Sequence, residues 1–105
     1  MRTLFQTIKQ QFLEGNDLVL ASITASSGST PRGAGSHMLI GKSGRIAGTI
    51  GGGAVEYRAE LMAQDILEKK ESCEHEFRLN RKDIENIGMI CGGDVTVFFQ
   101  YLDHN

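Results

Sequence analysis

Glycine is the residue that most constrains how this chain can fold. The sequence holds 13 glycines and one proline, and most of the glycines gather in three segments, at residues 28–35, 48–53 and 91–93. A glycine inside a helix or strand costs roughly 0.5–1 kcal/mol relative to alanine. Such clusters therefore indicate loops whose backbone adopts left-handed conformations or approaches a ligand closely.

The stretches around these clusters carry periodic apolar patterns that predict secondary structure. A continuous apolar run at residues 18–23 is typical of a strand buried on both faces. Helices are expected over residues 2–14 and 54–70, and further strands over residues 36–40, 45–48, 73–79 and 95–101. The order α-β-β-β-α-β-β predicts a single α/β (α+β) domain over residues 1–105, with a mixed β-sheet and two main helices packed on it.

Charge and composition exclude several classes of function. The net charge of −2 comes from interleaved signs, so binding to nucleic acid or to a membrane surface by bulk electrostatics is not expected. No segment has the ~20 apolar residues of a membrane span, and the N-terminus lacks the apolar core of a signal peptide. Two cysteines, Cys73 and Cys91, fit a reducing compartment and are too few for a structural zinc site. We therefore expect a cytoplasmic protein.

The first glycine segment combines a stiff backbone with polar side chains. Pro31 restricts its own φ and pushes Thr30 into an extended conformation, while Gly35 allows a left-handed turn. Ser29 and Thr30 add hydroxyl groups, and Arg32 adds a fork of donors suited to phosphate or carboxylate. The segment is equally compatible with a hairpin connection that exposes an arginine.

The second segment runs from an expected strand into an expected helix. Gly51, Gly52 and Gly53 leave room for a ligand beside the helix N-terminus, where free N–H groups favour an anion. The spacing matches neither a Walker loop nor a dinucleotide-binding fingerprint. Glu56 is a candidate ligand contact, and the alternative is that it stabilises the start of the helix while the glycines serve tight packing.

The third segment places a thiol beside two glycines. Cys91, followed by Gly92 and Gly93, is accessible to a bulky ligand, although a cysteine after Met89 and Ile90 also fits a small buried hydrophobe. Cys73 is expected to lie in the core. The three histidines lack metal-ligand spacing, and His104 is expected in a frayed terminus.

In order and spacing, the stretches Gly28–Gly35, Gly48–Glu56 and Cys91–Gly93 resemble the signature of the XdhC/CoxI family, and in particular its N-terminal domain. The resemblance implies a chaperone rather than an enzyme. It would bind molybdenum cofactor (molybdopterin or its dinucleotide form), assist sulfuration by a cysteine desulfurase and deliver the cofactor to a xanthine dehydrogenase-type enzyme.

The resemblance also implies which residues bind the cofactor. Arg32 and the backbone N–H groups of the glycine segments would hold its phosphate, and Cys91 would approach the molybdenum centre. The full set of expected cofactor-binding residues is Ser29, Thr30, Arg32, Gly35, Gly51, Gly52, Gly53, Glu56, Cys91, Gly92 and Gly93.

Two departures from the family pattern keep alternatives open. Ala54 stands where many relatives carry a cysteine, and the C-terminal Rossmann-type domain of full-length relatives is not expected within 105 residues. The chain would then recruit a separate Rossmann-domain chain or form a homodimer. One alternative function is a non-catalytic interaction subunit that docks a separate Rossmann-domain partner and binds no small ligand of its own. Another is an enzyme that acts on a nucleotide-like ligand through Glu56 or Cys91.

Overall fold

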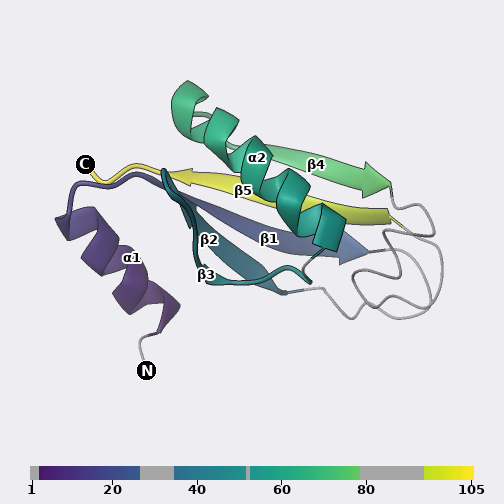
Figure 1. The fold of residues 1–105 in the computed structure, drawn as a ribbon, viewed down its shortest axis with the longest axis horizontal. Coiled ribbons are helices and arrows are strands. Elements are labelled where there is room, and N and C mark those ends of the chain that lie inside the picture. The colour runs from purple at the N-terminus through teal and green to yellow at the C-terminus, as the bar shows by residue number, and fades with distance from the viewer. Residues whose placement is uncertain (1–2, 27–34, 52, 79–93) are drawn as a thin grey trace.

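The computed structural model describes residues 3–26, 35–51, 53–78 and 94–105 (Figure 1). Within them, helices and strands follow one another in the predicted order, which confirms the α+β class. The elements are α1 (Leu4–Leu13), β1 (Leu18–Ser26), β2 (His37–Gly41), β3 (Gly44–Gly48), α2 (Gly53–Lys69), β4 (Cys73–Arg78) and β5 (Asp94–Leu102).

The strands form one sheet in the order β3-β2-β1-β5-β4, and each of these neighbouring pairs is antiparallel. This differs from the mixed sheet that the sequence led us to expect. A strand-helix-strand unit usually makes its two strands parallel neighbours. Here α2 carries the chain from β3 at one edge to β4 at the other, so these two strands run in the same direction without pairing.

Helix α2 lies across one face of the sheet (Figure 1), and the core residues lie between them. Ala59 and Ala63 are one turn apart on the buried side of α2, and their small side chains let the helix approach the strands closely. Central strand β1 is buried on both faces at its start, because Leu18 and Val19 are both fully inaccessible to solvent. The prediction of a strand is confirmed, and burial on both faces holds for its start, since Leu20 and Ser22 further along are only partly buried. Cys73 also packs against the core, as expected.

Helix α1 forms as predicted but, among the residues that the structure describes, it does not pack on the core. Thr3 and Gln6 make a capping box at its start, in which each side chain accepts a hydrogen bond from the other residue's backbone N–H. None of its residues is buried, and Phe5 and Leu13 are 80% and 74% exposed. The expectation that this helix packs on the core was therefore wrong. Amphipathic spacing predicts which face of a helix is apolar, but it does not predict which part of the protein covers that face.

No helix among the described residues is long and apolar enough to cross a membrane.

Candidate functional site

The three glycine segments are connected to the same end of the sheet, which we call the glycine end. Strand β1 stops here at Ser26, opposite Val95 near the start of β5, and β4 stops at Arg78, opposite Asp94. The first segment therefore follows a strand that ends here, and the third segment directly precedes the start of β5, which lies beside the ends of β1 and β4 (Figure 1).

Backbone contacts bring the return of the first segment and the start of the second to the same place. The N–H of Gly35 donates to the carbonyl of Ile23 at 3.0 Å, and the N–H of Ile23 donates to the carbonyl of Ser36 at 2.9 Å. Gly48, where the second segment begins, pairs with Met38 near the start of β2. The sheet thus places at one end the strand ends to which three motifs, distant in sequence, are joined.

Glu56 organises the second segment from the first turn of α2. Its Oε1 atom accepts hydrogen bonds from the hydroxyl of Thr49 and from the N–H of Ile50, the latter at 3.3 Å. The N–H of Gly51 in turn donates to the Thr49 hydroxyl oxygen at 3.2 Å. The carboxylate is therefore bonded to its own loop. This arrangement favours the role of Glu56 in stabilising the helix start over direct contact with a ligand.

Arg45 is a neighbour of this network that sequence reasoning missed. Its Nη1 atom donates to the carbonyl of Gly48 at 2.8 Å, and its Nε lies 4.0 Å from Oε2 of Glu56. The Arg45 side chain is 48% exposed, against 17% for Glu56. The glycine end therefore presents a partly exposed cation beside the start of α2. Arg45 lies in a short strand and belongs to no sequence motif, so no signal in the sequence would have identified it.

Four of the expected cofactor-binding residues lie in the described part of the chain, at the glycine end. Gly35 and Gly51 have φ values of +89° and +116°, a conformation that side-chain-bearing residues rarely adopt. Gly53 begins α2, and Glu56 lies in its first turn. The remaining expected residues are outside the described residues: Ser29, Thr30, Arg32, Gly52, Cys91, Gly92 and Gly93.

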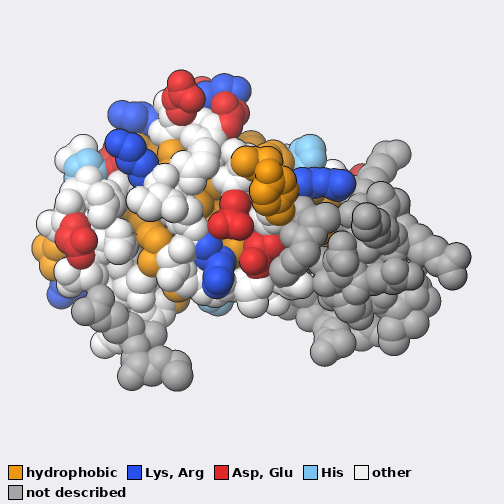
Figure 2. All heavy atoms as spheres, viewed as in Figure 1, with side chains coloured by type: hydrophobic (Ala, Val, Ile, Leu, Met, Phe, Trp, Pro, Cys, Tyr) orange, Lys and Arg blue, Asp and Glu red, His pale blue; other side chains and the backbone are white. Residues whose placement is uncertain are grey.

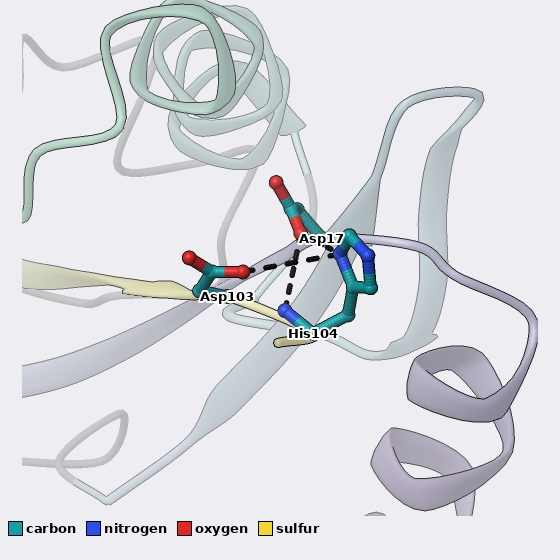
Figure 3. A group of neighbouring side chains, drawn as sticks. All are labelled: Asp17, Asp103 and His104. Carbon is teal, nitrogen blue, oxygen red and sulfur yellow. Dashed lines mark hydrogen bonds and ion pairs between the residues drawn. The ribbon is translucent and has the colours of Figure 1, made fainter.

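A second polar cluster lies at the opposite end of the sheet, which we call the terminal end (Figure 3). Asp17, just before β1, accepts hydrogen bonds from the Tyr101 hydroxyl, from the N–H of His104 at 3.1 Å and from the His104 ring. Asp103 lies beside the same ring, at 3.9 Å from Nδ1. The expectation that His104 lies in a frayed terminus was therefore wrong.

These contacts shift the ionisation of the cluster. The hydrogen bonds from Tyr101 and then from His104 lower the pKa of Asp17 from 3.8 to about 2. The hydrogen bond to Asp17 raises the pKa of Tyr101 from 10.0 to about 12. Asp17 and His104 are 87 positions apart, so no local pattern could have joined them. The pairing of Leu18 with Leu102 brings them together.

The sequence profile of the XdhC and CoxI family matches residues 12–78, so this chain belongs to that family. The match includes the first two glycine segments and ends before the third. The chain is 41% identical over 80 residues to the uncharacterized protein YqeB of Escherichia coli K12, an alignment that covers 75% of this chain and 14% of YqeB.

The fold is shared with a crystal structure described as a xanthine dehydrogenase from Bacillus halodurans. That structure superposes with a TM-score of 0.68 at 19% sequence identity, over 92% of this chain and 30% of the other. At this identity the similarity establishes the fold alone. The chain thus spans less than a third of each of these two relatives.

Proposed function

We propose that this chain is an accessory protein that binds molybdenum cofactor. It would assist sulfuration of the cofactor by a cysteine desulfurase and its insertion into a xanthine dehydrogenase-type molybdenum hydroxylase. Membership of the XdhC and CoxI family supports this function. The structural observation that carries it is the attachment of all three glycine segments to one end of the sheet. Their residues need that proximity in order to bind one ligand.

The described residues at this end have chemistry that suits an anionic pterin cargo. The N-terminus of α2 provides the positive end of a helix dipole, which favours a phosphate group. Arg45 adds a partly exposed guanidinium group beside that N-terminus. In this proposal Glu56 and Thr49 keep the loop in shape, while the cofactor is held by backbone N–H groups, Arg32 and Cys91.

Anaerobic binding of molybdopterin and of its dinucleotide form to the purified chain tests the proposal. We expect Arg32→Ala to weaken binding by about tenfold or more, because a charge-assisted hydrogen bond contributes about 1.5–3 kcal/mol. Cys91→Ser should weaken binding of the molybdenum-loaded cofactor more than that of the metal-free pterin. Lys42→Ala is the matched control, because it removes an exposed cation from the β2–β3 turn at the terminal end. Equal affinity in Arg32→Ala and Lys42→Ala would reject the assigned site.

A second candidate function is an interaction subunit that binds no small ligand. Tyr57 and Leu61 are 64% and 55% exposed on α2, and Figure 2 shows hydrophobic side chains grouped on this face. An exposed apolar group of this kind is a common feature of protein-binding surfaces. The double substitution Tyr57→Ser, Leu61→Ser should then abolish a complex with a separate Rossmann-domain chain in size-exclusion chromatography. Under the cofactor proposal, the same variant retains its affinity for molybdopterin.

A further inference from the structure

We propose that Asp17, Asp103 and His104 form a binding site for a divalent transition-metal cation such as Zn²⁺, at the terminal end of the sheet. One ligand atom from each residue lies within 4.8 Å of the other two (Figure 3). Asp17 comes from the α1–β1 connection, and the other two residues follow β5. The pairing of β1 with β5 holds these two segments side by side, so the site is part of the sheet's framework.

The type of donor selects the class of cation. One imidazole nitrogen and two carboxylate oxygens suit Zn²⁺, Co²⁺ or Ni²⁺, whereas Mg²⁺ and Ca²⁺ prefer oxygen-only sites. Zinc bonds to these atoms are about 2.0–2.2 Å long, so two ligands of one ion are at most about 4.4 Å apart. The three donor atoms lie within 4.8 Å of one another here, which is close to that limit. Three protein donors leave a fourth position for water or another ligand.

Hydrogen bonds from outside the donor set orient Asp17. Tyr101 donates its hydroxyl to Oδ2 at 2.5 Å, and the N–H of His104 donates to Oδ1 at 3.1 Å. Metal-binding carboxylates are commonly held in this way, and such outer contacts strengthen binding. The ring of His104 already contacts the same Oδ1 atom, so a cation would replace that hydrogen bond by binding both partners.

The site is accessible from solvent. The side chains of Asp17 and His104 are 22% and 32% exposed, and that of Asp103 is 54% exposed. Asp17 also lines an open groove of about 480 Å³, together with Lys42, Gln64 and Glu68. The two carboxylates carry a charge of −2 that a divalent cation would neutralise. The Lys42 ammonium group opposes binding, and Glu68 on the same groove favours it.

Titration of the metal-free full chain with Zn²⁺ in a calorimeter tests the proposal, with Co²⁺ absorption as a spectroscopic readout of the ligand field. We expect a single Zn²⁺ per chain, no comparable binding of Mg²⁺, and at least about tenfold weaker binding in His104→Ala and in Asp103→Asn. Both substitutions change exposed or partly exposed side chains, so circular dichroism should show an unchanged fold.

His37→Ala and His75→Ala are matched controls, because both histidines are exposed and lie outside the cluster. They should leave Zn²⁺ affinity unchanged. Tyr101→Phe keeps all three donors and should weaken binding by about 10–100-fold through loss of the outer hydrogen bond. Absence of Zn²⁺ binding by folded protein would overturn the proposal, and so would equal affinity in His104→Ala and His37→Ala. Molybdopterin plays no part in this measurement, so its result is independent of the proposed function.

Discussion

The two ends of the sheet are built by different means. At the glycine end, the hydrogen-bond network of the side chains is local: Glu56, Thr49, Ile50 and Gly51 lie within eight consecutive positions and bond to one another. At the terminal end, Asp17 is bonded to residues more than 80 positions away. The glycine end depends on backbone conformation and a helix N-terminus, whereas the terminal end depends on charged side chains. Local motifs can reveal the parts of a site of the first kind, whereas only the sheet pairing reveals even the parts of one of the second kind.

Gly48→Ala should have the largest effect, because this glycine lies at the point where β3 leads into the glycine end. Its φ is +76°, and an added Cβ would lie inside 3.0 Å of the carbonyl oxygen of His37. We expect a loss of about 2–4 kcal/mol in the free energy of unfolding, measured with urea. Gly15→Ala near the terminal end is the control: φ is +83° with nothing within 4 Å, so the loss should be about 1–2 kcal/mol. Equal losses in the two variants would show that the strain of a positive φ accounts for both effects and that the contact with His37 adds nothing.

Glu56→Ala tests whether the glycine end depends on its local network. The substitution leaves the N–H of Ile50 and the hydroxyl of Thr49 without their acceptor, so we expect a loss of about 1–3 kcal/mol in urea unfolding. Asp65→Ala removes a carboxylate of the same helix whose ion pair with Lys69 is exposed, and should change stability by at most about 0.5 kcal/mol. A Glu56→Ala variant as stable as Asp65→Ala would contradict the assigned role.

The terminal end should respond to acid. The pKa of Asp17 is lowered from 3.8 to about 2 in the folded protein, so its contribution to stability is present above pH 4. Between pH 4 and pH 2 the carboxyl group of Asp17 binds a proton more readily in the unfolded state than in the folded state, so its contribution to stability decreases. The contribution is lost as the pH falls through 2, where both states become protonated. We expect the urea midpoint to fall between pH 4 and pH 2. The fall should be smaller in Asp17→Asn, and an identical fall in both proteins would exclude Asp17 as its source.

The smallest effect is expected just after α2, at Lys70. This residue has a φ of +60°, and its N–H donates to the carbonyl of Ile66 at 2.7 Å, as in a left-handed helix cap. Lys70→Gly should therefore raise the melting temperature slightly, by a gain of about 0.5–1 kcal/mol. Lys69→Gly, one position earlier and still within the helix, should lower it by about 1 kcal/mol. A decrease in both variants would show that the conformation of Lys70 is not strained.

Local sequence patterns predicted most of the secondary structure, because the spacing of apolar residues follows the periodicity of the helix or strand that they form. The alternation through Val95, Val97 and Phe99 marks a strand with one face in the core, and all three are buried there. The strand directions were not predictable in the same way. They depend on where α2 delivers the chain, and the spacing of Val55, Ala59 and Ala63 defines only the face of the helix that is buried.

By itself, the sequence determined the order of the elements, the buried face of α2 and the family to which the chain belongs. Each of these depends on near neighbours in the chain or on motifs of a few residues. The tertiary structure alone decided the antiparallel sheet, the attachment of the three glycine segments to one end, and the meeting of Asp17 with His104 at the other. These features depend on strand pairing, which joins residues without regard to their separation in sequence.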